Sequence, residues 1–419
     1  MVLSIMTNLL LAAGILLGGY SIYFLIIALW GLRSAPKAPV ASPKTQFALV
    51  VAARNEAAVI GHLVDSMLAL DYPRELFEVI VAPNNCTDDT AAVAKAHGAK
   101  LFIPQGPVHS KGEVLAQVVD SVILPGHYDA MCVFDADNLV DGAFLQHMNA
   151  ELLCGAQIVQ GFRDSKNPRQ SAMSGCYSIC YWMVNRFYNR GRAALGLSAL
   201  VNGSGFALSR DMLLTLGGWH TKTMTEDYEI SAQCALAGGR VTFCEEARVY
   251  DEQPITFGES WKQRRRWTTG SLQGMRLYGG ELFKNVVLRR SAVCLDLYLT
   301  FLMPLVQVIS LVCGMGSVAI IVLRGTLLLH GVLVHGATIA MLFVCISLLL
   351  AIGGSMLLAA CVVVLQRMPL RDMAKGIVTY WVFLLSHMAL TLLSFVRQKT
   401  VWEPVAHTAA VSLSQIQKK

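Results

Sequence analysis

A basic motif that ends in an indole, Gln263-Arg264-Arg265-Arg266-Trp267, follows an acidic motif, Thr225-Glu226-Asp227, in the second half of the chain. A carboxylate can accept a proton, guanidinium groups can hold phosphates, and an aromatic ring can support a sugar. A strongly apolar region follows the two motifs. This combination predicts glycosyl transfer at a membrane.

A second acidic motif, Asp135-Ala136-Asp137, directly follows an apolar run that is typical of a strand. Two carboxylates one residue apart at a strand end can hold a divalent cation on a diphosphate, because hard oxygen ligands suit Mg²⁺ or Mn²⁺. The structural alternative is a solvated turn, or a helix cap provided by Asn138 or Asp141. The motif therefore predicts a metal site only in combination with the others.

The aromatic residue Trp267 has two interpretations. Tryptophan is common where a domain meets lipid headgroups, but a position directly after Arg266 favours stacking against a sugar. The basic residues that follow, Lys284, Arg289 and Arg290, are expected to face anionic headgroups. No recognised nucleic-acid motif accompanies this charge, so nucleic acid is not an expected partner.

The elements around these motifs alternate between strands and helices. This alternation predicts a mainly parallel sheet that helices cover on both faces. Ligands of such sheets bind at the carboxyl ends of the strands, where Asp135 and Asp137 would lie. The aromatic and basic segment 171–197 is equally consistent with a domain helix and with a membrane-surface helix. Strands are expected at residues 47–53, 78–82, 130–134 and 158–162, a turn at 83–85, and helices at 57–70, from about 88 and from about 142.

The composition is that of a membrane protein. Hydrophobic residues make up 54% of the 419 residues and charged residues only 15%, and the charges concentrate in the central block. Residues 8–30 carry no charge and are long enough to cross a hydrocarbon core of about 30 Å. Arg33, Lys37 and Lys44 follow this run, so the positive-inside rule predicts an outer N-terminus and a cytoplasmic central block. Eleven cysteines without a C-x-x-C pair are consistent with reduced thiols.

The chain is apolar again after residue 296. Spans are expected at residues 297–323 and 376–396, with a long uncharged run at 326–366 between them. Three crossings in this region would place the tail outside, whereas its basic residues Arg397, Lys399, Lys418 and Lys419 favour the inside. Two solutions are open, because the middle run could hold two short helices or the last stretch could lie at the membrane interface.

Taken in order, the motifs resemble those of the membrane-integrated family 2 glycosyltransferases, the group of cellulose, chitin, hyaluronan and poly-N-acetylglucosamine synthases. The resemblance extends from residue 45 to about residue 290. It rests on Val51-Ala-Ala-Arg-Asn-Glu56, Leu70-Asp-Tyr-Pro73, Asn85-Cys-Thr-Asp-Asp89, Lys111-Gly112, Phe134-Asp-Ala-Asp137, Asn202-Gly-Ser-Gly205, Thr225-Glu-Asp227, Asp251-Glu252 and Gln263-Arg-Arg-Arg-Trp267.

This resemblance implies an α/β domain of the GT-A type in the cytosol, between N- and C-terminal transmembrane helices of a multi-pass plasma-membrane protein. The expected division is an anchor at 1–32, a linker at 33–46, the transferase domain at 47–290, membrane and interface helices at 291–400 and a polar tail at 401–419.

The resemblance also implies roles for individual residues. Asp227, beside Glu226, would be the general base, and Asp137 would bind Mg²⁺ or Mn²⁺. The donor nucleotide would contact Asn55, Glu56, Asn84, Lys111, Asp135 and Arg266. The acceptor would contact Gln263, Trp267, Asn202, Gly203 and Ser204.

One departure concerns Asn84, because the family often has an aspartate at this position. An amide oxygen can also accept a hydrogen bond from uracil N3–H, but its NH₂ group adds a donor that a carboxylate lacks. Asn84 and Asn85 are also ordinary turn residues, since asparagine tolerates left-handed backbone angles. A UDP-sugar is still the expected donor.

The implied reaction is an inverting transfer from a UDP-sugar to a growing β-linked polysaccharide, exported through the membrane helices, with accessory export proteins as further partners. The alternative is transfer of a single sugar to a lipid-linked acceptor, and product length distinguishes the two. A transporter without enzymatic activity would leave the α/β domain unexplained. A nucleotide-dependent oxidoreductase would need a G-x-G-x-x-G motif after the first strand, and this chain lacks one.

Overall fold

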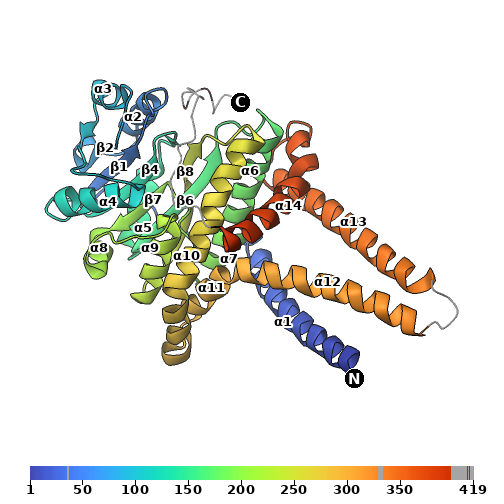
Figure 1. Cartoon of the computed structure of the whole chain (residues 1–419). Coiled ribbons are helices and arrows are strands. Elements are labelled where there is room, and N and C mark those ends of the chain that lie inside the picture. Colours follow the sequence, from blue (N-terminus) through green and yellow to red (C-terminus); the bar gives the residue numbers. More distant parts are fainter. Residues whose placement is uncertain (35–36, 329–333, 398–412, 414, 416–419) are drawn as a thin grey trace.

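The computed structural model describes residues 1–34, 37–328 and 334–397, together with residues 413 and 415. An α/β domain carries three long helices that extend away from it (Figure 1). They are α1 (Val2–Trp30), α12 (Met303–Leu328) and α13 (Val334–Leu365). The helix α14 (Ala374–Val396) lies against the domain. The chain therefore returns to the α/β domain after its long apolar helices.

One eight-stranded sheet, with the strand order β3-β2-β1-β4-β7-β6-β8-β5, forms the centre of the domain. The pairs among β1, β2, β3 and β4 are parallel, and β6 is parallel to β8. However, β7 is antiparallel to its neighbours β4 and β6, and β5 is antiparallel to β8. The sheet is thus mixed rather than mainly parallel, because an apolar run does not reveal its direction. The strands are β1 (Phe47–Ala53), β2 (Phe77–Pro83), β3 (Lys100–Leu101), β4 (Ala130–Asp135), β5 (Leu139–Val140), β6 (Ile158–Ser165), β7 (Phe206–Ser209) and β8 (Val241–Asp251).

Helices cover both faces of the sheet, as the alternation of strands and helices predicted. Alternate residues of β1 enter different cores: Phe47, Leu49 and Val51 pack on one face, and Ala48 and Val50 on the other. The first core is closed by α2 (Ile60–Leu68), α3 (Thr90–Ala96) and α5 (Phe144–Leu153). The second is closed by α4 (Lys111–Val118), α6 (Ala172–Met183), α8 (Arg210–Leu216) and α9 (Glu226–Leu236). Polar site residues are therefore left to the strand ends.

The segment 171–197 forms helices that pack into the domain. It forms α6, the π-helical segment η3 (Val184–Arg190) and α7 (Gly191–Ala194). Tyr177, Ile179 and Trp182 are buried in the core of the domain. Both α13 and α14 pack on α6, so other helices occupy part of the surface that a membrane-surface helix would offer to headgroups.

A separate helix, α11 (Ala292–Phe301), connects the domain to α12. Its Leu297 is fully buried, so the apolar span begins at Met303 and not at residue 297 as expected. Asp296 forms a fully buried ion pair with Arg192 of α7 at 2.7 Å, and Tyr23 of α1 donates a hydrogen bond to the same carboxylate at 3.0 Å. Removing one partner of such a pair typically costs about 3–5 kcal/mol. These contacts fix α1 and α11 to the domain.

Among the described residues, four helices are long and apolar enough to cross a membrane, namely α1, α12, α13 and α14. The described part of the run 326–366 contains the end of α12 and one long helix, α13, so two short helices do not occur there. Between α1 and α12, the helix α10 (Phe257–Arg289) carries the basic motif. Short helical turns complete the described domain at η1 (Arg74–Leu76) and η2 (Val119–Ile123).

Candidate active site

The carboxyl ends of β1, β2 and β4 meet at one edge of the sheet. The strand register pairs Ala53 at the end of β1 with Pro83, and Ala52 with Asp135. The segments that follow these three strands therefore lie side by side. This is where ligands of α/β sheets bind, and it is where the sequence placed the acidic pair.

Two asparagines with left-handed backbone angles shape the loops after β1 and β2. Asn55 has a φ of 58° and Asn85 a φ of 50°, a region that asparagine tolerates better than most residues. The side-chain oxygen of Asn55 accepts the N–H of Thr87 at 2.8 Å. The N–H of Asn84 donates to the carbonyl of Ala53 at the end of β1, at 2.8 Å. The N–H of Glu56 donates to Oγ1 of Thr90 at the start of α3, also at 2.8 Å. The two loops are thus held together as one unit.

The two aspartates after β4 differ in their surroundings. Asp135 lies 2.6 Å from Nζ of Lys111, and its N–H donates to Oγ of Ser204 at 3.0 Å. Asp137 is buried, and one of its oxygens accepts the N–H of Glu252 at 2.8 Å. Within the described part of the chain, Asp137 forms no ion pair. Asp135 is therefore in direct contact with a lysine, whereas Asp137 is only near the charges of Lys166 and Arg163.

Lys111 joins the donor side of the site to the loop at 202–205. Its ammonium group donates to the carbonyl of Gly203 at 2.8 Å and lies 3.4 Å from Oε1 of Glu226. Burial disfavours the charge of Lys111, but Asp135 and Glu226 outweigh it and raise the lysine pKa above its usual value. Burial also opposes the charge of Asp135, yet Lys111 and then Arg163 hold its pKa below the usual range. Both groups therefore stay charged.

Asp227 lies in the first turn of α9, beside this lysine. Burial, followed by the charge of Glu226, raises the pKa of Asp227 to about 7. The N–H of Tyr228, which donates to Asp227 at 2.9 Å, and the charge of Lys111 act in the opposite direction. A Cβ atom on Gly203 would lie 3.5 Å from Oδ2 of Asp227, so the loop at 202–205 borders the carboxylate. A carboxyl group with this pKa can accept a proton near neutral pH.

Arg163 occupies the centre of the site and was missed by the sequence analysis. Its guanidinium group pairs with Asp251 at 2.6 Å, lies 3.9 Å from Asp135 and donates to the carbonyl of Asn202. The expected strand ended at residue 162, whereas β6 continues to Ser165. An expected strand end at residue 165 would have placed Arg163 among the site residues. Asp251 belonged to a motif of the resemblance but had no role there.

The basic motif on α10 divides its arginines between two partners. Arg264 is buried and donates to the carbonyl of Phe383 in α14 at 2.6 Å, so it contacts α14 instead of the strand ends. Arg266 lies close enough to Asp135 for its charge to lower the pKa of that carboxyl group. Only part of the motif therefore serves the predicted site.

The predicted acceptor residues lie in a partly aromatic setting. Trp267 is half-buried and meets Tyr177 and Tyr181 edge to face, at centroid distances of 5.8 Å and 6.2 Å. Oε1 of Gln263 and Nδ2 of Asn202 are buried polar atoms without a hydrogen-bond partner among the described residues. Buried polar atoms nearly always have a partner. These two therefore offer hydrogen-bonding capacity that the described chain does not use.

The acidic pair offers few protein ligands to a divalent cation. No group of three or more His, Cys, Asp or Glu side chains able to hold a metal occurs among the described residues. From the described residues, the candidate carboxylate ligands are Asp137 and Asp135. Mg²⁺ is typically bound by one or two carboxylates, with substrate phosphates and water completing its coordination, and Mn²⁺ also suits oxygen ligands. The pair fits a cation that binds together with a nucleoside diphosphate.

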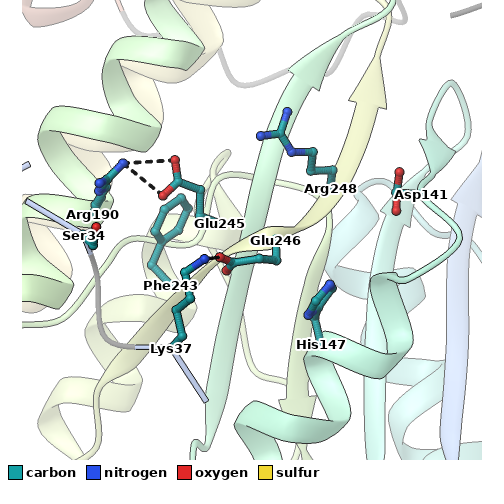
Figure 2. A pocket seen from close by; sticks show the side chains of 9 residues that line it. All are labelled: Ser34, Lys37, Asp141, His147, Arg190, Phe243, Glu245, Glu246 and Arg248. Atoms are coloured by element: carbon teal, nitrogen blue, oxygen red, sulfur yellow. Dashed lines mark hydrogen bonds and ion pairs between the residues drawn. The ribbon is translucent and has the colours of Figure 1, made fainter. Parts of the chain in front are cut away.

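A pocket of about 520 Å³ lies elsewhere, between β8, α5 and the linker that follows α1 (Figure 2). Figure 2 shows Arg190 paired with Glu245 and Lys37 paired with Glu246. None of the predicted site residues lines this pocket. Because four of its charged side chains are paired with one another, the pocket does not present the uncompensated charge that a diphosphate needs.

Replacing Lys111 by methionine is expected to move the acidic limb of the pH–rate profile to higher pH. Lys111 lowers the pKa of Asp227, so its removal raises that pKa, and the active carboxylate is then lost at a higher pH as the pH falls. Lys111→Arg keeps the charge and should leave the limb near its original position. The measurement is kcat/KM for the acceptor between pH 5 and 9. An unchanged limb in Lys111→Met would contradict the coupling.

The residues that form this site lie within a recognisable sequence family. Residues 43–270, more than half of the 419-residue chain, match the model of the family described as "Glycosyltransferase like family 2". The chain is 28% identical over 249 residues to a beta-monoglucosyldiacylglycerol synthase of Synechocystis sp., a match that covers 55% of this chain and 49% of the relative. It is 25% identical over 228 residues to a poly-beta-1,6-N-acetyl-D-glucosamine synthase of Staphylococcus aureus, covering 53% of each. The chain therefore spans about half the length of these curated relatives.

The fold is also found in solved structures. A mannosyltransferase of Pyrobaculum calidifontis, in complex with GDP-Man and Mn²⁺, has a TM-score of 0.58 and 17% sequence identity. The match covers 93% of this chain and 99% of the mannosyltransferase. The predicted GT-A fold is thereby confirmed, and the identity is too low for this likeness to say more than that.

Proposed function

The chain belongs to the glycosyltransferase-like family 2, and on this premise we propose that it transfers one sugar from a UDP-sugar to a lipid-embedded acceptor at the cytosolic face of the plasma membrane. One relative is named for a glycolipid product and another for a polysaccharide. The choice between these acceptors rests on the position of the site relative to the membrane helices.

The loops after β1 and β2 are assigned to the nucleoside. Asn55 fixes them to each other, and Glu56 and Asn84 lie in them at the edge of the sheet. The amide oxygen of Asn84 can accept from uracil N3–H, as an aspartate would. The diphosphate would then lie beside Asp135 and Lys111, at the end of β4.

Asp227 is the proposed general base. Its pKa of about 7 lets the carboxylate take a proton from the acceptor hydroxyl. The acceptor oxygen forms a bond to the anomeric carbon, the bond from that carbon to the diphosphate oxygen breaks, and UDP leaves with the bonding electrons. Arg266 and Lys111 flank Asp135, where their charges can stabilise the leaving group. A single displacement inverts the anomeric carbon, so an α-linked donor gives a β-linked product.

Asp137 is the proposed protein ligand of Mg²⁺ or Mn²⁺. When bound, the cation supplies positive charge that favours departure of the diphosphate. The N–H of Glu252 donates to one carboxylate oxygen of Asp137 and so orients the group. Because Asp135 is paired with Lys111, Asp137 is expected to make the larger contribution to metal binding.

A single contact carries the acceptor assignment. Tyr228, the residue after Asp227, packs its ring against Phe301 at a centroid distance of 5.6 Å. Phe301 ends α11, and the apolar span of α12 begins at Met303. The proposed base therefore lies close to the start of the candidate membrane helix α12. An acceptor that keeps its lipid tail in the bilayer could present its hydroxyl group there.

The acceptor headgroup is proposed to use the unpaired polar atoms of the site. Oε1 of Gln263 can accept a hydrogen bond from a hydroxyl group, and Nδ2 of Asn202 can donate one. Trp267 would support the apolar face of the headgroup. These contacts would hold the acceptor hydroxyl near Asp227, beside the loop that contains Gly203.

Transfer of a single sugar is preferred over polymer synthesis because of the membrane helices. A polysaccharide conduit needs polar or aromatic side chains that face one another. In α13, Phe343 is the one aromatic residue and Thr338, Ser347 and Ser355 are widely spaced, and few side chains in the apolar windows of α1 and α12 are buried against other helices. Processive synthesis is the second candidate. It is favoured by the motif Gln263-x-x-Arg266-Trp267, and only this candidate needs export proteins.

The proposal predicts that sugar label from one UDP-sugar enters the lipid fraction of membranes that contain the protein. Membranes are incubated with a panel of labelled UDP-sugars and extracted with chloroform and methanol. The label should partition into the organic phase, and membranes with the Asp227→Asn variant are the control. Label confined to an ethanol-insoluble aqueous product would favour the polysaccharide instead.

A further inference from the structure

Both ends of α14 contact the α/β domain. At its start, Gly376 approaches Gly175 of α6 so closely that a Cβ atom on Gly376 would lie 2.9 Å from the Gly175 carbonyl carbon. Near its end, Oγ of Ser394 lies 2.7 Å from Oγ1 of Thr268 in α10. Just after the helix, the carbonyl of Arg397 accepts a hydrogen bond from the guanidinium group of Arg265 at 3.3 Å. The helix therefore lies along the domain instead of leaving it.

A buried arginine of α10 forms hydrogen bonds with the middle of α14. Arg264 of α10 donates to the carbonyl of Phe383 at 2.6 Å and to Oγ of Ser386 at 2.9 Å. Its guanidinium group also lies 4.2 Å from the centroid of the Phe383 ring. Together with the end contacts, this interaction shows that one face of α14 meets α6 and α10 over the whole length of the helix (Figure 1).

The segment before α14 is charged and is held on the same side. Asp372 forms an ion pair with Arg169 of the domain at 3.2 Å. Arg371 exposes 89% of its side chain, and Lys375 in the first turn of α14 is exposed as well. Basic side chains in this position are suited to lipid headgroups.

Part of the remaining surface of α14 is apolar and uncovered. The membrane helices α13 and α12 cover other parts of it, and Oγ1 of Thr391 lies 3.2 Å from Oε1 of Gln307 in α12. The exposed residues of α14 follow a helical spacing, and the exposed fractions are 54% for Val378, 39% for Leu384, 62% for Leu385, 37% for Leu392 and 38% for Phe395. The helix therefore packs against protein on part of its surface and presents a hydrocarbon surface on the uncovered part.

A crossing of the membrane by α14 conflicts with these contacts. The helix has 23 residues, about 35 Å in length, which is enough to cross a core of about 30 Å. If it crossed, Arg264 of α10 would be held at the depth of the bilayer centre by its bonds to Phe383 and Ser386. Arginine is costly at that depth. A helix that lies along the surface avoids this cost.

We propose that α14 lies in the membrane–water boundary, with its apolar face in the lipid and its other face on the domain. Three crossings then remain, by α1, α12 and α13, and Arg397 lies on the same side as the catalytic domain. This arrangement removes the conflict between the number of spans and the basic residues of the tail. The proposal does not depend on which sugar or acceptor the protein uses.

Labelling by a membrane-impermeant maleimide tests the side of the tail. The full chain carries Lys418→Cys, with the exposed Cys154 of the domain and Ser4→Cys in α1 as references, each alone in a background without other exposed cysteines. The tail position should react from the same side of sealed vesicles as Cys154, and Ser4→Cys from the opposite side. Labelling of Lys418→Cys from the same side as Ser4→Cys would overturn the proposal.

Spin labels test the orientation of α14 directly. Val378, Leu385 and Leu392 are seven residues apart on the exposed face, so a crossing helix would spread them over about 21 Å of depth. Each is replaced by a labelled cysteine in protein reconstituted into lipid vesicles. The ratio of collision rates with oxygen and with a water-soluble nickel complex should be nearly equal at the three positions.

Phe343, Leu350 and Leu357 of α13 form the matched set, because they have the same spacing and are exposed by 48%, 69% and 67%. This set should show a graded ratio, as expected for a crossing helix. A graded ratio in α14 would contradict the proposal. Low collision rates with both reagents would show that protein covers this face, and would overturn its assignment to lipid.

Discussion

Replacing Asp227 by asparagine is expected to lower the turnover number of sugar transfer by about 10²- to 10⁴-fold, the usual loss for a positioned general base. Asparagine can still accept the N–H of Tyr228, so the start of α9 should keep its structure. Donor binding should change little, because Asp227 is assigned neither to the nucleotide nor to the metal. The measurements are kcat for the purified variant and its affinity for UDP by titration calorimetry.

Asp211→Asn is the matched control, because Asp211 is an exposed carboxylate in the first turn of another helix, α8. It should retain the activity of the unmodified protein. The pH profile adds an independent readout: activity of the unmodified protein should fall as the pH drops through about 7, where Asp227 becomes protonated. Near-normal turnover in Asp227→Asn would exclude this residue as the base.

Replacing Asp137 by asparagine is expected to abolish the effect of Mn²⁺ on UDP binding and, with it, most of the activity. Changes to residues that merely support a metal ligand typically weaken metal affinity by about 10- to 100-fold, and loss of a ligand should cost more. The amide oxygen can still accept the N–H of Glu252, so the local structure is retained. The measurement is UDP affinity with Mn²⁺ and with excess EDTA.

Asp120→Asn provides the control for this experiment, since Asp120 is an exposed carboxylate on η2. In the control, Mn²⁺ should strengthen UDP binding as it does in the unmodified protein. Asp135→Ala should weaken UDP binding with and without Mn²⁺, because Asp135 holds Lys111 beside the proposed position of the diphosphate. Full activity of the unmodified protein in EDTA would contradict the metal assignment.

Strands buried on both faces were predictable because their chemistry is local. In β1, every residue from Phe47 to Val51 is fully buried. An uninterrupted apolar run in the sequence predicts this burial. The acidic pair after β4 was predictable for the same reason, since it marks a strand end. No strand was expected at β7 (Phe206–Ser209), so its antiparallel direction was not predicted either.

Side-chain direction limited the prediction of the site. Arg264 and Arg266 are two residues apart in one motif, but Arg264 reaches α14 and Arg266 lies near Asp135. The sequence could not separate them, because the partner of Arg264 comes from a helix more than a hundred residues away. Arg163 was missed because its place in the site depends on its ion pair with Asp251, which joins the neighbouring strands β6 and β8. The predicted roles of the other site residues stay predictions.

The most direct test of the proposed function is the mass of the product made by the purified protein in lipid nanodiscs. The protein is supplied with the UDP-sugar that gave labelled lipid, and the extracted lipids are analysed by mass spectrometry and NMR. The proposal predicts one added sugar per acceptor lipid, joined by a β-linkage. A ladder of products that grows with time, without a lipid carrying a single sugar, would contradict it and support processive polymer synthesis.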